Sequence, residues 1–137
     1  MACIILSVAK CCLNFVSFVL FFLCSEACRL LISKGADIAA QNNHQRTPLH
    51  LAVQSGSLET VQCLLDPMLF NTLEITDADQ NTPLHLACMQ NWLNLLNFLL
   101  DKGADVTALN KDNMTCLDMA IEWDSVEVAR TLVKHER

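Results

Sequence analysis

Glycine and proline are scarce in this sequence, and tyrosine is absent. The 137 residues contain 3 Gly, 3 Pro and no Tyr. Collagen-like and low-complexity chains need far more glycine and proline, so both classes are excluded. Basic residues are also few, 9 against 15 acidic residues, and the formal net charge is −6. This charge argues against a general phosphate-binding surface and predicts no nucleic-acid partner.

Apolar residues are plentiful but unevenly distributed. Hydrophobic residues make up 53% of the chain, which excludes disorder for most of it and suits a single domain. Residues 1–32 hold only three charged side chains, whereas residues 33–137 hold 7 basic and 14 acidic ones. The chain is therefore interpreted as an apolar segment, 1–24, followed by an acidic remainder, 25–137.

A six-residue motif recurs at a nearly constant spacing. Residues 47–52 read TPLHLA, residues 82–87 read the same, and a weaker copy stands at 115–120, so the steps are 35 and 33 residues. Pairs of aliphatic residues, from Leu30-Leu31 to Leu132-Val133, keep the same rhythm. Several landmarks in one register indicate a repeat architecture.

Each repeat is predicted to contain two helices. Thr47 is a suitable N-cap, and Pro48 fits the first helical turn because no backbone N–H is needed there. Apolar residues then follow at helical spacing, and the first helix ends at Gly56, which Asn91 and Asp124 replace in the later units. All three residue types tolerate the left-handed conformation of a helix C-terminus. A second apolar helix and a polar loop lead to the next threonine.

With these features the sequence resembles the ankyrin-repeat family, whose T-P-L-H-x-A motif recurs about every 33 residues. The resemblance implies an all-α fold, an ankyrin-repeat solenoid of stacked helix-turn-helix units with hairpin-like loops. We expect an apolar N-terminal helix to precede it. The repeats are expected at 25–46 (partial), 47–81, 82–114 and 115–137 (truncated).

The resemblance also implies structural roles for the motif residues. The threonines should cap the first helices, and the histidines should tie neighbouring repeats together. The residues concerned are Thr47, Pro48, His50, Thr82, Pro83, His85 and Thr115. Asp118 stands where a third histidine would be, so the resemblance implies no histidine bond to a neighbouring repeat at that position.

The loop tips depart from the family pattern. The family usually places glycine where this sequence has Gln45, Gln80 and Asn113. Asparagine takes a left-handed turn readily, whereas glutamine does so less readily. We therefore expect distorted or mobile tips at the two glutamines.

The middle unit departs from the pattern at residues 66–72. Pro67 is expected to end the second helix early. Three large apolar residues, Met68-Leu69-Phe70, follow it. Two interpretations stay open: they fold back onto the helices, or they form an exposed anchor for a partner.

No catalytic residues, cofactor or metal site are predicted. His50 and His85 occupy equivalent repeat positions, so a structural role explains them without catalysis or metal binding. Residues 77–81 resemble the start of a calcium loop, but the glycine and glutamate that such a loop needs are missing. Three cysteines at helix positions are expected to be core residues rather than reactive thiols: Cys63, Cys88 and Cys116.

Another protein is the predicted partner, because the resemblance implies binding through the loop tips and the inner face of the first helices. The acidic balance favours a basic partner surface. On the helices and their turns, the expected binding residues are Gln54, Met89, Gln90, Trp92, Glu122 and Trp123. At the tips they are Asp79, Gln80, Lys111 and Asp112.

Three interpretations compete for the apolar N-terminus. A signal peptide would have Lys10 before its apolar core, but cleavage near Ser25-Glu26-Ala27 would split a predicted helix. Residues 2–25 are also long enough to span a membrane. In the third interpretation, the segment replaces the first helix of the partial repeat. Hydropathy favours membrane association through residues 2–25, and the family resemblance predicts cytosolic repeats.

The C-terminal stretch at 114–137, MTCLDMAIEWDSVEVARTLVKHER, is similar to the last cytosolic repeats of ankyrin-type transient receptor potential channels. It lacks a polar capping repeat, so we expect a longer parent array. The predicted function is a non-catalytic protein–protein interaction module, tethered to a membrane by its first residues. The alternative is a cytosolic ankyrin fragment of a transient receptor potential-type cation channel.

Overall fold

The computed structural model describes residues 25–33, 35, 37–65 and 72–136. These ranges contain helices and loops and no strand. The helices are α3 (Ser25–Ser33), α4 (Pro48–Ser55), α5 (Leu58–Leu64), α6 (Pro83–Met89), α7 (Leu93–Asp101), α8 (Cys116–Glu122) and α9 (Val126–His135). The predicted all-α fold is therefore confirmed for the part of the chain that is described.

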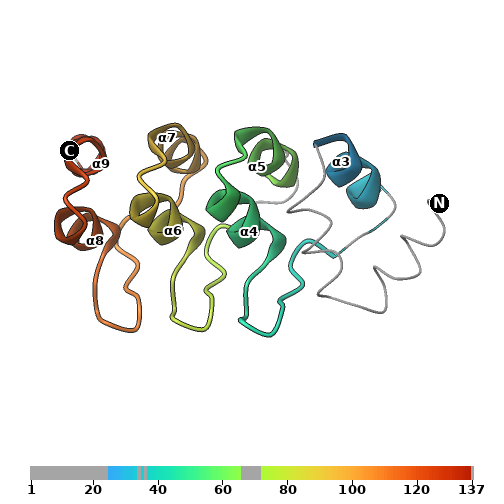
Figure 1. Ribbon diagram of the computed structural model, residues 1–137, viewed down its shortest axis with the longest axis horizontal. Helices are drawn as coiled ribbons and strands as arrows, with labels where there is room; N and C mark the ends of the chain where they lie inside the picture. The colour runs from blue at the N-terminus through green and yellow to red at the C-terminus, as the bar shows by residue number, and fades with distance from the viewer. Residues whose placement is uncertain (1–24, 34, 36, 66–71, 137) are drawn as a thin grey trace.

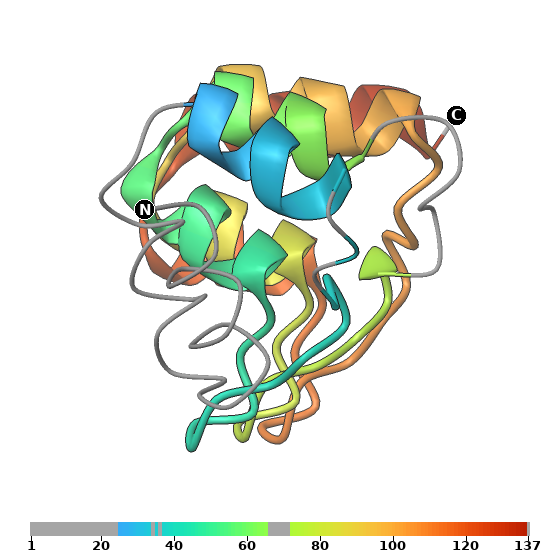
Figure 2. The ribbon, with the colours of Figure 1, turned by 90° about the vertical axis from the view of Figure 1, so that its right-hand side faces the viewer.

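The helices form two parallel rows. Helices α4, α6 and α8, which we call the inner helices, contact one another in order. Helices α3, α5, α7 and α9 do the same in the second row, which we call the outer row. Figure 1 shows the helices nearly end-on, with the α4–α6–α8 row lying between the other row and the long loops. In Figure 2 the loops extend away from both rows on one side. This is the stacked arrangement that the ankyrin resemblance implies.

The predicted N-terminal helix lies outside the described residues. Met68-Leu69-Phe70 lie outside them as well, so both interpretations of that segment stay open. Within the described ranges, every helix is too short or too polar to cross a membrane. Helix α3 begins at Ser25, so cleavage after Ala27 would cut a helix, as the sequence predicts. Helix α5 has 7 residues against 9 in α7, in agreement with the helix-ending effect of Pro67.

Both ends of the inner helices follow the local sequence. The Thr47 hydroxyl accepts a hydrogen bond from the His50 backbone N–H at the start of α4, and Pro48 stands in the first turn. At the C-terminal ends, Gly56 has φ 75°, and Asn91 and Asp124 have φ 56° and 54°. All three take the predicted left-handed conformation, so a left-handed residue follows each first helix at the same position of its repeat.

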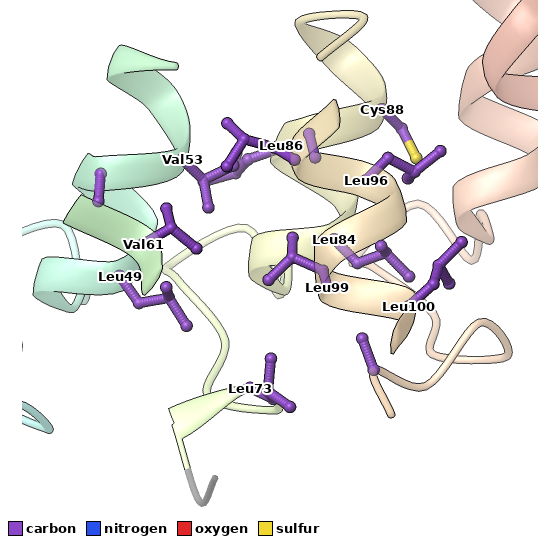
Figure 3. Packing of buried hydrophobic residues seen from close by; sticks show 14 of the residues in the cluster. Leu49, Val53, Val61, Leu73, Leu84, Leu86, Cys88, Leu96, Leu99 and Leu100 are labelled. Carbon is purple, nitrogen blue, oxygen red and sulfur yellow. The ribbon is translucent and has the colours of Figure 1, made fainter. Parts of the chain in front are cut away.

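Aliphatic side chains fill the space between repeats. In Figure 3, side chains of α4 and α5, among them Val53 and Val61, face side chains of the next pair, among them Leu86 and Leu99. Leu86 is 6% exposed and the other three are fully buried. Burying one such side chain stabilises the fold by about 1.5–3 kcal/mol. The expected core cysteines Cys63, Cys88 and Cys116 are buried in the same cluster.

The expected distortion of the glutamine tips is wrong. Gln45 and Gln80 have φ 57° and 60°, which matches φ 58° at Asn113. In each tip the N–H of this residue donates to the carbonyl three positions earlier, at 2.9–3.0 Å. The three tips therefore share one geometry.

A side-chain clamp explains why glutamine is forced into this turn. In each loop, one Asn or Asp oxygen accepts hydrogen bonds from the backbone N–H groups two and four positions later, at 2.9–3.1 Å. Such bonds hold a turn from its first residue, whatever stands at its third or fourth. The clamping residues, which sequence reasoning missed, are Asn42, Asp77 and Asn110.

Candidate functional site: a concave surface between loop tips and inner helices

Two buried histidines tie neighbouring repeats together below the tips. His50 Nε2 lies 3.0 Å from the Asn81 carbonyl oxygen of the next repeat. His85 Nε2 lies 3.2 Å from the Met114 carbonyl oxygen in the same way. A carbonyl can only accept, so each Nε2 carries the proton and donates. The sequence predicts this tie, and the structure shows which atoms make it.

The other nitrogen of each ring completes the helix cap. His50 Nδ1 accepts from the Thr47 backbone N–H at 3.2 Å and lies 2.8 Å from the Thr47 hydroxyl. His85 repeats this with Thr82, at 3.2 and 2.9 Å. Burial lowers the pKa of His50, so the ring is neutral at pH 7. These rings position the backbone rather than perform chemistry.

Asp118 keeps only half of this arrangement. One of its carboxylate oxygens accepts from the backbone N–H and from the hydroxyl of Thr115, both at 2.9 Å. The bond from that backbone N–H is the main reason that the pKa of Asp118 is lowered. The carboxylate therefore caps α8 within its own repeat, whereas each histidine also bonds to the next repeat.

Hydrogen bonds also join the tips to one another. The Ala78 N–H donates to the His44 carbonyl, and the Lys111 N–H donates to the Asp79 carbonyl, both at 3.0 Å. The Lys111 ammonium additionally donates to the Asp79 carboxylate. That bond lowers the pKa of Asp79 and raises the pKa of Lys111. The second and third tips are thus held side by side.

A shallow concavity of about 290 Å³ lies between these two tips and the inner helices α6 and α8. We call it the concave site. Six of its lining residues are among those predicted to bind a partner: Asp79, Met89, Lys111, Asp112, Glu122 and Trp123. Four more lining residues were missed by sequence reasoning: Asn81, Asn110, Met114 and Met119.

The residue before each motif threonine explains why the hollow opens here. In the first unit this residue is Arg46, whose Nη1 donates to Gln54 Oε1 at 2.9 Å and whose Nε lies 3.7 Å from Asp77 Oδ2. The arginine therefore spans the inner surface between α4 and the second tip. Its counterpart in the second unit is Asn81, which is short, buried and bonded to Asn110 at 3.3 Å. The sequence shows that positions 46 and 81 differ, but their partners are known only from the structure.

The other four predicted binding residues lie elsewhere. Gln54 accepts from Arg46, Gln80 is exposed at a tip, and Gln90 is exposed at the end of α6. Trp92 lines a separate groove of about 370 Å³ and covers Gly56. A Cβ added to that glycine would meet the indole ring at 2.8 Å. The two tryptophans therefore serve different surfaces.

Reactive groups do not gather in the described part of the chain. No three side chains of His, Cys, Asp or Glu are close enough there to hold a metal ion. Four cysteines in this part are buried and form no disulfide: Cys28, Cys63, Cys88 and Cys116. Burial raises the pKa of Cys28 to about 12, so that thiol stays protonated at pH 7.

Known proteins support the same architecture. Residues 24–65 match a family profile described as ankyrin repeats (many copies), and residues 67–137 match one described as ankyrin repeats (3 copies). The chain is 30% identical over 109 residues to a transient receptor potential cation channel subfamily A member 1 homolog of Caenorhabditis elegans. It is also 30% identical over 112 residues to the subfamily A member 1 channel of Drosophila melanogaster.

Each of these alignments covers 80% of this chain and 9% of the channel protein. A third relative, the B-cell lymphoma 3 protein homolog of Mus musculus, is 30% identical over 110 residues, which is 78% of this chain and 25% of that protein. The chain thus spans a quarter or less of these relatives. The profiles, the motif and the stacked helix pairs agree, and the chain belongs to the ankyrin-repeat family.

Proposed function

We propose that this chain is a non-catalytic interaction module that binds another protein at the concave site. Ankyrin repeats typically bind other proteins. One observation supports the location most strongly: six residues chosen from sequence as binding residues line a single hollow. They come from two tips and two inner helices, so the fold is what brings them together.

The concave site has the composition of a protein-binding surface. Two of its lining residues are Trp123, which is 59% exposed, and Met89, which is partly buried. Exposed tryptophans are enriched among residues that dominate binding energies, and methionine adapts its shape to a partner. The bonds between the tips hold this surface in place, which lowers the entropic cost of binding.

Site-specific photo-crosslinking tests the proposal. Benzoylphenylalanine in place of Trp123 keeps an aromatic ring at the concave site, and the same residue in place of Asn97 labels the exposed side of α7 in the outer row. We expect a discrete protein adduct in cells from position 123 and none from position 97. Equal labelling from both positions, or no adduct from 123, would contradict the proposal.

We also propose that residues 2–25 attach the chain to a membrane, with the repeats in the cytosol. The support is the uncharged run at residues 11–24. Membrane pelleting of the full chain and of a chain lacking residues 1–24 tests this. The deletion should move the protein into the supernatant, whereas unchanged pelleting would refute the attachment.

A second candidate is that the chain forms part of the repeat array of a transient receptor potential-type cation channel. The similarity to two such channels over 80% of the chain supports it. The B-cell lymphoma 3 protein homolog is equally similar, so identity alone does not favour a channel. An immunoblot with an antibody against the 105–114 loop separates the two: a band near 15.3 kDa supports the module, and a band several times heavier supports the larger protein.

A further inference from the structure

We propose that the partner segment bound at the concave site carries an apolar side chain flanked by arginine or lysine. This rests on the proposed function and specifies its chemistry. Three features of the site lead to this proposal. They are an apolar floor of three methionines (Met89, Met114 and Met119), an acidic rim (Asp79, Asp112 and Glu122) and an exposed aromatic edge (Trp123).

The floor is apolar because its polar groups are already bonded. Three methionines line the site: Met119 is 4% exposed, and Met89 and Met114 are partly buried. The Asn110 amide donates to Asn81 Oδ1 at 3.3 Å and lies 3.6 Å from Met119 Sδ, while its oxygen accepts two backbone N–H groups. A polar group of a partner would lose water here and gain little, so an apolar side chain is favoured.

The rim has an excess of negative charge. It carries three carboxylates, Asp79, Asp112 and Glu122, and one ammonium, Lys111. Lys111 is held by Asp79. Among the described residues, neither Asp112 nor Glu122 forms a salt bridge with a cationic side chain.

The aromatic edge favours a cation for a second reason. Trp123 directly follows Glu122 in the chain, and both side chains are exposed. The face of an indole ring attracts a guanidinium or ammonium group, and the neighbouring carboxylate adds to that attraction. A cation next to an apolar residue can therefore contact the rim while the apolar side chain contacts the methionines.

A displayed library of random twelve-residue peptides, selected against the full 137-residue chain, is the probe. Selected peptides are then measured against three variants whose folding is checked by circular dichroism. Trp123→Ala removes the aromatic edge, and Glu122→Gln removes one rim charge. Glu127→Gln makes the same charge change on α9 in the outer row, away from the concave site, and serves as the control.

We expect the selected pool to be enriched in arginine or lysine beside an apolar residue. Binding should fall about tenfold in Trp123→Ala and about threefold in Glu122→Gln, and should stay unchanged in Glu127→Gln. Raising the salt concentration should reduce the effect of Glu122→Gln.

The two ways of failing are distinguishable. If selected peptides depend on Trp123 but lack cationic residues, or if Glu122→Gln behaves like Glu127→Gln, the partner chemistry is wrong and the proposed function stands. If no selected peptide depends on Trp123, binding at the concave site is itself refuted.

Discussion

Single residues in this protein often satisfy two requirements at once. His50 accepts from Thr47 through Nδ1, which completes the cap of α4, and donates from Nε2 to Asn81 of the next repeat. Protonation would turn Nδ1 into a donor and break the cap. Burial opposes the charge as well, so the pKa of His50 lies below 6.5.

This pKa predicts a loss of stability in mild acid. Because the folded-state pKa is lowered, the contribution of His50 is complete above the unfolded value of 6.5 and is lost as pH falls below it. An NMR titration should show the His50 ring protonating below pH 6.5. Between about pH 7 and pH 5.5, the melting temperature of His50→Gln should decrease less than that of the unsubstituted chain. Both proteins in that comparison contain His85, so the difference between them reports on His50. A His50 midpoint at or above 6.5 would contradict the prediction.

Gln80 carries backbone strain that its loop imposes. Its φ of 60° costs a residue with a Cβ roughly 1–2 kcal/mol, whereas glycine avoids that cost. The greater freedom of glycine in the unfolded chain offsets part of this gain. Gln80→Gly should therefore stabilise the fold by a net amount of about 0.5–1 kcal/mol.

Gln90 supplies the control for this measurement. It lies at the end of α6 with φ −89°, where glycine relieves no strain. Gln90→Gly should therefore lower the free energy of unfolding, while Gln80→Gly raises it, in urea denaturation. The same sign for both variants would refute the strain at Gln80.

At the scale of elements, the helices are too short to be stable alone. They have 7–10 residues, whereas isolated helices need about 12–15 to be even marginal in water. Their ends must therefore be set by caps and by contacts with neighbouring elements. The turn after α4 shows both, because Gly56 takes φ 75° and Trp92 of the next unit covers it.

Gly56→Ala should therefore be more costly than Gly103→Ala. Both glycines have positive φ, so alanine costs about 1 kcal/mol at either position. Only at Gly56 would the new methyl group meet the Trp92 ring, at 2.8 Å, whereas nothing lies within 4 Å at Gly103. We expect an additional loss of about 1–2 kcal/mol at Gly56 in urea denaturation.

A double-mutant cycle isolates the clash. In a Trp92→Ala background, the extra cost of Gly56→Ala should disappear. An extra cost that persists without the indole ring would mean that backbone strain alone distinguishes the two glycines.

At the scale of the whole molecule, equivalent positions differ because of where they stand in the stack. Val53, Cys88 and Ile121 occupy the same position of successive inner helices. The first two are fully buried by the next repeat, whereas Ile121 is 65% exposed on α8. Apolar contacts between repeats, rather than contacts within one repeat, account for this burial.

Val53→Asp should therefore unfold the stack, while Ile121→Asp should change its stability by less than about 1 kcal/mol. A buried unpaired carboxylate costs several kcal/mol, comparable with the whole stability of a small domain. Thermal unfolding followed by circular dichroism gives the melting temperature of both variants, which carry the same substitution at equivalent helix positions. Similar melting temperatures for the two would contradict a stack held together by its interfaces.

Much of the fold could be predicted from sequence because it depends on residues close together in the chain. The threonine caps and the helix ends at Gly56, Asn91 and Asp124 follow from local geometry. The prediction failed at Gln45 and Gln80 because it weighed each glutamine alone. The clamp that forces their conformation comes from Asn42 and Asp77, three residues earlier.

Less of the concave site could be predicted, because it depends on contacts between repeats. Of the two tryptophans, Trp123 lines the site and Trp92 covers Gly56 instead. The sequence places both near the turn between two helices and does not separate them. Their different surroundings arise from residues of other repeats.

The repeat, its period, its helix caps and the apolar faces of its helices all follow from the sequence alone. The reason is that hydrogen bonds and side-chain spacing over a few residues specify these features. The packing of one repeat on the next sets which equivalent side chains are buried and where the concave site lies. Those outcomes depend on neighbours about one repeat away, such as Arg46 spanning one interval of the inner surface and Asn81 leaving the next one open.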